Sequence, residues 1–140
     1  MCSFNVQANA KGLAQLASMM AYKGQGLMSE DAWNEMHSQD TAEYDRLFYC
    51  LNTRSRFTKG GLCYFQNLPD ATKSEKENLN KNRQGYYGWF GYGGSVFQWH
   101  PEQKIGFAFV PTVLSAVEIF NERGAILQQL VKDCAAAAEN

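Results

Sequence analysis

The chain has 140 residues, of which 45% are hydrophobic and 19% are charged, which excludes wholesale disorder and suits one packed domain. Its 13 lysines and arginines are matched by 14 aspartates and glutamates, so the charge gives no case for nucleic acid or an anionic membrane as a partner. No apolar run is long enough to span a membrane, and the four cysteines and two histidines are too scattered for a zinc site, so we expect no metal or other cofactor.

Two helices are predicted in the first third of the chain. Between Asn9 and Lys23, apolar residues recur at three- and four-residue spacing and line one face. Asn9 is a typical N-cap, and Gly24 stands where a helix often ends. Ser29 predicts the N-cap of a second helix, because the two acidic residues that follow it favour the positive end of a helix.

The middle of the chain changes from helical to extended patterning. Residues 37–52 are mixed, and residues 44–48 predict a short helical turn. After Phe57 and a glycine pair, the apolar run 62–65 predicts a strand. Residues 67–84 are polar and lysine-rich, with a proline near their start, so we expect an exposed loop there.

Residues 86–111 predict a β-hairpin. Aromatic and β-branched residues alternate with glycine as far as Trp99, a polar turn with proline follows at 100–104, and a second apolar run ends at Pro111. The tail predicts an amphipathic helix that begins near Asn121, because apolar residues return at helical spacing and four consecutive alanines follow.

These elements predict an α+β fold in a single domain, residues 1–140. Its parts are a helical segment (1–56), antiparallel strands (57–111) and a C-terminal helix (112–140) that packs its apolar face on the hairpin. A sheet of two or three strands is small for this length, and its edges need a cover. We therefore expect an exposed sheet edge that invites self-association or another partner.

The hairpin carries a resemblance to a known family. The run Gly91-Tyr92-Gly93-Gly94-Ser95, followed by the Pro101-Glu102 turn and the strand that ends at Pro111, resembles the β-lactamase-related serine hydrolases. That family includes class C β-lactamases, penicillin-binding proteins and related esterases. Residues 9–17 and 26–33 are similar to two of its helices, in the same order. The resemblance implies the C-terminal part of a β-lactamase/transpeptidase-like fold.

The resemblance assigns a role to Tyr92, Gly93, Gly94 and Ser95. In the family, a strand with a Lys-Thr-Gly-type box binds the edge of the substrate, and these residues are similar to that box. Tyr92 stands where lysine or histidine is frequent, so a fixed positive charge is missing, although a phenol still donates a hydrogen bond. Gly93 and Gly94 leave room for a substrate. The backbone N–H of Ser95 is implied to be an oxyanion donor, a role worth about 3–4 kcal/mol.

The family's nucleophile is missing from the sequence. No serine has a lysine three positions later, so there is no Ser-x-x-Lys motif, and no Tyr-x-Asn or Tyr-x-Ser motif supplies the second proton-transfer group. We therefore expect the C-terminal segment of a serine hydrolase that is inactive alone. Two alternatives remain: a non-catalytic, truncated relative that acts as a binding or interaction protein, and a partner chain that supplies the nucleophile.

Three further features have a structural interpretation beside a functional one. Lys59-Gly60-Gly61 resembles the box, but the hairpin pattern does not follow it, which favours a loop. His100 has the chemistry of a general base, but its place beside a turn favours a structural role. His37 is expected at a helix end. The amino terminus has no signal-peptide pattern, so the cytoplasm is the default compartment if Met1 is the true start.

Overall fold

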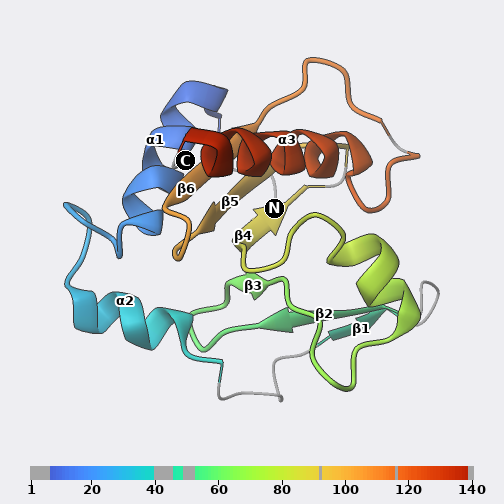
Figure 1. Ribbon diagram of the computed structural model, residues 1–140, viewed down its shortest axis with the longest axis horizontal. Helices are drawn as coiled ribbons and strands as arrows, with labels where there is room; N and C mark the ends of the chain where they lie inside the picture. The colour runs from blue at the N-terminus through green and yellow to red at the C-terminus, as the bar shows by residue number, and fades with distance from the viewer. Residues whose placement is uncertain (1–6, 40–45, 49–52, 92, 116, 139–140) are drawn as a thin grey trace.

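The structure, a computed structural model, describes residues 7–39, 46–48, 53–91, 93–115 and 117–138. These residues form an α+β arrangement of helices and an antiparallel sheet (Figure 1). In chain order the elements are α1 (Ala10–Ala21), α2 (Glu30–His37), β1 (Arg46–Phe48), β2 (Thr53–Phe57), β3 (Cys63–Tyr64), the π-helical turn η4 (Glu75–Leu79), β4 (Tyr87–Phe90), β5 (Val96–His100), β6 (Ile105–Phe109) and α3 (Glu122–Ala138).

The sheet is a meander in which each strand pairs with its neighbour in sequence. Its order is β1-β2-β3-β4-β5-β6, and every pairing is antiparallel. On β5, Phe97 lies opposite Trp89 of β4 on one side and Ala108 of β6 on the other. In the described part of the chain β6 is an edge strand, since it pairs only with β5.

The sheet is larger than the two or three strands predicted. β1 and the first four residues of β2 fall within residues 1–56, which were predicted to be helical. Residues 46–48 are a strand, so the helical turn predicted at 44–48 is wrong there, while residues 44 and 45 lie outside the described chain. β2 gives no apolar alternation because its interior positions, Thr53 and Ser55, are polar. A pattern search for strands therefore passes over it.

The two faces of the sheet are covered by different helices. On β5, Phe97 and Trp99 belong to a cluster with Ala17 of α1, whereas Val96 packs in a cluster beneath α3. A Cβ on Gly124 of α3 would lie 2.6 Å from Val96 Cγ2. Because alternate residues of a strand point to opposite faces, α1 and α3 lie on opposite sides of the sheet.

The N-caps predicted for α1 and α2, Asn9 and Ser29, are confirmed. Asn9 Oδ1 accepts a hydrogen bond from the N–H of Gly12 at 2.8 Å, and Ser29 Oγ accepts one from Ala32 at 3.2 Å. α3 begins one residue after Asn121, whose Oδ1 accepts from Gly124 N–H at 3.2 Å. Short side chains with an acceptor oxygen satisfy the first free N–H groups of each helix, which is why these starts are readable from sequence.

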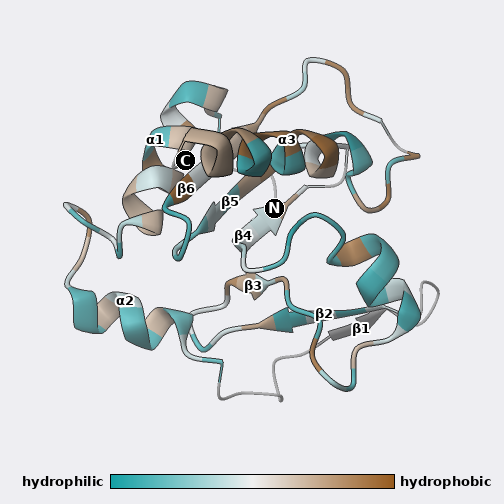
Figure 2. Ribbon diagram, in the orientation of Figure 1, coloured by the Kyte–Doolittle hydropathy of each residue, from teal (hydrophilic) through white to brown (hydrophobic). Residues whose placement is uncertain are grey.

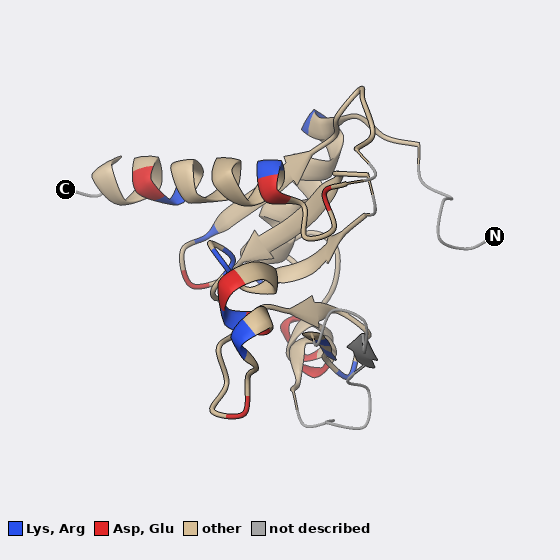
Figure 3. Ribbon diagram, turned by 90° about the vertical axis from the view of Figure 1, so that its right-hand side faces the viewer, with Lys and Arg blue, Asp and Glu red and all other residues tan. Residues whose placement is uncertain are grey.

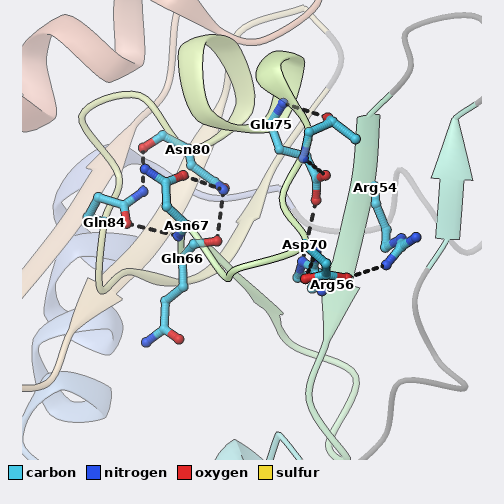
Figure 4. A network of polar contacts seen from close by, with 9 residues as sticks. Arg54, Arg56, Gln66, Asn67, Asp70, Glu75, Asn80 and Gln84 are labelled. Atoms are coloured by element: carbon cyan, nitrogen blue, oxygen red, sulfur yellow. Dashed lines mark hydrogen bonds and ion pairs between the residues drawn. The ribbon is translucent and has the colours of Figure 1, made fainter.

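Residues 67–84 are not the exposed loop that was predicted. Glu75, Asn80 and Arg83 are buried within this segment. Figure 4 shows how Asn80 donates from Nδ2 to the backbone oxygen of Gln66 at 2.9 Å. Glu75 lies 3.3 Å from the buried Arg56 of β2. The polar side chains thus bond to one another and to the backbone instead of to water, and composition does not distinguish the two cases.

Candidate functional site

The predicted substrate box lies in the connection between β4 and β5. The chain turns tightly between Gly91 and Ser95, where Gly91 N–H donates to Ser95 O at 2.7 Å and Gly94 N–H donates to Gly91 O at 3.1 Å. The hairpin predicted over residues 86–111 therefore contains three strands, β4, β5 and β6, because this turn divides its first half. The reason is the glycine pair: Gly93 and Gly94 have φ angles of +103° and +116°, which residues with a side chain rarely adopt and which turn the chain here.

Gly93 and Gly94 are buried against the segment that precedes α3. Gly93 accepts a hydrogen bond from Ser115 N–H at 3.1 Å. A Cβ on Gly94 would lie 2.9 Å from Arg123 Nη2, and one on Gly93 would lie 3.1 Å from a methyl carbon of Leu114. Backbone conformation and packing within the chain account for both glycines.

Of the other two residues of the box, Ser95 is among the described residues and Tyr92 is not. Ser95 is half-buried, and its carbonyl accepts a hydrogen bond from Asn121 Nδ2 at 3.1 Å. Its Oγ lies near Gly91, where an added Cβ would come within 2.6 Å of it. Tyr92 lies outside the described residues. The structure therefore brings Gly93, Gly94 and Ser95 together with Asn121, at the start of α3.

An apolar groove lies on the α1 side of the sheet, next to this turn along β4 and β5. It encloses about 350 Å³. It is lined by Phe57, Gly61, Leu62, Gly88, Trp89, Phe97 and Trp99. Trp89 is 45% exposed, stacks on Phe57 with 5.7 Å between ring centroids, and lies opposite Phe97 across the two strands. A volume of this size is in the range of small-molecule sites.

Gly88 lets β4 and β5 approach closely beneath the groove. It has a φ of +115°, and a Cβ there would lie 2.4 Å from Phe97 O. The described residues that line the groove include no serine, cysteine, histidine or charged side chain. These residues give the groove an apolar contact surface. The exposure of Trp89 follows only from the fold, since an aromatic residue in a predicted strand is ordinarily buried.

A second, polar cavity of about 630 Å³ lies at the other end of β4 and β5. Its lining is Trp33, Gln66, Asn67, Leu68, Gln84, Gly85, Tyr87, His100, Pro101 and Glu102. His100 is the last residue of β5, and its Nδ1 accepts a hydrogen bond from Gln103 N–H at 3.2 Å. Burial first, and then the charge of Lys132, lowers the pKa of His100. Among the described residues that line this cavity there is no serine, threonine or cysteine, and the hydroxyl present is the phenol of Tyr87, which accepts a hydrogen bond from Gln39 Nε2 at 2.6 Å.

His37 ends α2 as predicted, and both of its ring nitrogens are bonded. Nδ1 lies 2.7 Å from Trp33 O, and Trp99 Nε1–H donates to Nε2 at 2.9 Å. This pattern assigns the neutral tautomer with its proton on Nδ1. Burial is the main cause that lowers the pKa of His37, and the hydrogen bond to Trp33 opposes it. His37 therefore links α2 to β5 through hydrogen bonds at both ring nitrogens, which is a structural role.

The remaining predicted features are consistent with structural roles. Lys59, Gly60 and Gly61 form the turn between β2 and β3, where Gly61 N–H donates to Thr58 O at 2.9 Å.

Among the residues described, no three histidine, cysteine or acidic side chains gather as metal ligands would. The same residues include no helix with the length and apolarity needed to cross a bilayer. Neither family models nor curated proteins give a match to this chain.

Proposed function

We propose that this chain is the C-terminal segment of a β-lactamase-like serine hydrolase and supplies one wall of an acyl-transfer site. The apolar groove along β4 and β5, beside the turn at residues 91–95, is the observation that carries the proposal. In this role the groove holds the apolar part of the substrate, and Trp89 is its exposed contact. The nucleophile comes from outside residues 1–140, in a longer chain or a second protein.

The proposed chemistry divides between this chain and the missing part. An acyl transfer needs an attacking serine with a neighbouring base, and donors for the oxyanion that develops on the carbonyl. The Ser95 N–H is the candidate donor of this chain, and Tyr92 is a candidate hydrogen-bond donor to the substrate. The missing part brings the Ser-x-x-Lys motif. Alone, the chain positions a substrate and has no group that attacks it.

The first test is hydrolysis by the isolated chain. Nitrocefin and a p-nitrophenyl butyrate ester are expected to be turned over at the rate of the buffer alone, because no serine nucleophile with its lysine is present. A turnover that a serine-reactive phosphonate and Gly94→Val both abolish would overturn this expectation. Gly12→Ala, on the exposed side of α1, is the control that should leave any rate unchanged.

The second test concerns the natural gene product. Its intact mass and the sequence upstream of Met1 are expected to reveal a longer chain with Ser-x-x-Lys. In that longer protein, Trp89→Ala should lower kcat/KM for apolar esters by about tenfold, equivalent to the loss of about 1.4 kcal/mol of contact. Leu16→Ala, an equally exposed site on α1, is the matched control. An upstream sequence without the motif contradicts the hydrolase proposal.

The alternative is a truncated relative that acts by binding. The exposed Trp89 over an apolar groove without catalytic side chains favours it as the second candidate. A natural product that starts at Met1 and shows no hydrolysis would support it. The two functions are thus separated by the upstream sequence, and not by the activity of residues 1–140 alone.

A further inference from the structure

The polar cavity at the far end of β4 and β5 has a buried floor and an exposed rim. It encloses about 630 Å³. Trp33 and His100, which line its floor, are 9% and 5% exposed, and Tyr87 beside them is half-buried. Asn67 and Glu102 line the rim and are exposed. A concave site of this volume with buried aromatic rings at its base has the dimensions of a small-molecule site.

Two of the three side-chain amides that line the cavity are already held in place. Gln84 Oε1 accepts a hydrogen bond from Asn67 N–H at 3.0 Å, and Gln84 Nε2 donates to Asn80 O at 3.2 Å. Asn67 Oδ1 accepts from Asn80 Nδ2 at 3.2 Å (Figure 4). Because these amides are fixed by the protein, a ligand that bonds to them does not have to order them.

Hydrogen-bonding groups of the cavity remain unused within the described chain. The Gln66 side chain points away from the network in Figure 4, and neither its amide nor the Glu102 carboxylate has a partner there. The Tyr87 phenol accepts from Gln39 Nε2 at 2.6 Å, which leaves its O–H free to donate. The NH₂ groups of the two fixed amides also keep unused hydrogens. The cavity thus presents donors and acceptors side by side.

The charges of the lining favour a neutral ligand. Among the described lining residues there is no lysine or arginine to attract an anion. Burial holds the pKa of His100 below its ordinary 6.5, so its ring is neutral at pH 7. Glu102 lies exposed at the rim, where water and salt screen its charge. In the view of Figure 3, acidic and basic residues are interspersed, which gives no broad field of one sign.

A sugar ring matches this set of groups. Figure 2 shows hydrophilic, teal chain between η4 and β4 and in the turn between β5 and β6, two segments that contribute to the lining. Sugar hydroxyls both donate and accept, as side-chain amides do, and a carboxylate accepts from hydroxyls. The C–H face of a sugar packs on an aromatic ring. A purely apolar ligand would leave the polar groups of the lining unpaired.

We propose that the polar cavity binds a neutral saccharide of about one or two rings. Gln66, Tyr87 and Glu102 bond to its hydroxyls, and its ring lies on the aromatic floor. This inference is independent of the proposed hydrolytic role, because no residue lines both this cavity and the apolar groove.

Proton–nitrogen NMR of the whole chain tests the site. The probes are D-glucose, D-galactose, D-mannose, N-acetyl-D-glucosamine and cellobiose, each at up to about 50 mM, which exceeds the roughly millimolar dissociation constant expected of a few neutral hydrogen bonds. At least one probe should shift the Trp33 indole signal and the backbone signals of residues 66–68 and 84–87. Raising sodium chloride from about 20 to about 500 mM should leave that dissociation constant unchanged, because no ion pair forms.

Two substitutions remove a hydrogen-bonding group and nearly keep the size of the side chain. Gln66→Leu and Tyr87→Phe should each weaken binding about threefold, and about tenfold together. Gln25→Leu and Tyr22→Phe make the same chemical changes at exposed positions outside the cavity, and should leave the dissociation constant unchanged. The NMR spectrum of each variant shows whether it keeps the fold.

Four outcomes overturn the proposal. They are the absence of any shift with all five sugars at about 50 mM, shifts confined to residues outside the cavity, and an unchanged affinity in the folded double variant. The fourth is salt-sensitive binding of choline that is tighter than that of every sugar, which would make the cavity a site for organic cations.

Discussion

Gly106 on β6 sets how closely α1 lies on the sheet. A Cβ at this position would lie 2.2 Å from the backbone nitrogen of Ser18, and a backbone does not yield to such a contact without moving the helix. Gly12, in α1 itself, meets only Asn9 Oδ1 at 3.5 Å. Gly106 thus has no room for a side chain against α1, whereas Gly12 has room for one.

Substitution of these glycines by alanine is expected to give opposite changes in stability. Gly106→Ala should lower the free energy of unfolding by about 2–4 kcal/mol, because the added methyl overpacks the contact with α1. Gly12→Ala should raise it by about 1 kcal/mol, since alanine is the better helix former. Urea denaturation followed by circular dichroism measures both. A neutral Gly106→Ala would mean that α1 does not pack on β6 as described.

The two histidines predict how stability depends on pH. His37 and His100 both have a pKa below the ordinary 6.5, chiefly because they are buried. The unfolded chain therefore binds these protons more readily than the folded one. The stabilisation is complete above pH 6.5 and is lost as the pH falls through and below that value.

Denaturation in urea at a series of pH values checks this. The free energy of unfolding is expected to fall steadily between pH 7 and pH 5, a window above the ordinary pKa of 4.5 of Glu35 and 3.8 of Asp70. NMR titration of the His37 ring in the folded chain should have its midpoint below pH 6.5. A stability that rises on acidification would contradict the assigned neutral ring.

At the scale of elements, Arg83 fastens the start of α3 to the loop below β4. Its guanidinium donates to Leu79 O at 3.0 Å, Phe120 O at 2.7 Å and Asn121 O at 2.8 Å. It also lies over the ring of Phe90, 4.8 Å from the centroid. Burial is the first cause that lowers the pKa of Arg83 to about 10, and the nearby Glu122 opposes the shift.

Removal of this anchor is expected to destabilise the fold. Arg83→Met leaves three carbonyl oxygens without their charged donor and should lower the free energy of unfolding by about 2–4 kcal/mol. Arg54→Met is the matched control, since that arginine is partly exposed and its loss should cost within about 0.5–1 kcal/mol. Thermal denaturation compares the two. Equal losses would mean that Arg83 does not hold α3.

At the scale of the whole molecule, one strand joins the two hydrophobic clusters. Val96 of β5 belongs to the cluster beneath α3 and Trp99 of the same strand belongs to the cluster beneath α1. The clusters lie on opposite faces of one sheet and share its backbone hydrogen bonds. Neither face keeps its packing when β5 loses its strand partners.

The chain is therefore expected to unfold as one unit. Tryptophan fluorescence reports on the α1 side through Trp33 and Trp99, while far-ultraviolet circular dichroism reports on all helices. Their urea transitions should coincide in midpoint and slope. A fluorescence transition that precedes the loss of helix by more than the error of the fit would show two separate units.

The sequence was sufficient for features that depend on near neighbours. The starts of α1 and α2 follow from Asn9 and Ser29, because a capping side chain bonds to an N–H three residues away. The alternating aromatic run before Pro111 predicted antiparallel strands. Local hydrogen bonds and local periodicity need no knowledge of the rest of the chain.

Only the tertiary structure decided which features face one another. The turn at residues 91–95, the exposure of Trp89 and the burial of Arg83 depend on segments that are 20 to 40 positions apart. The outer face of α3 could not be distinguished from its inner face, since both carry apolar residues at helical spacing. Which face turns toward the sheet is fixed by small and polar residues, Gly124 and Gln128, that fit against β5. Burial is a property of the assembled chain, and a residue type alone does not contain it.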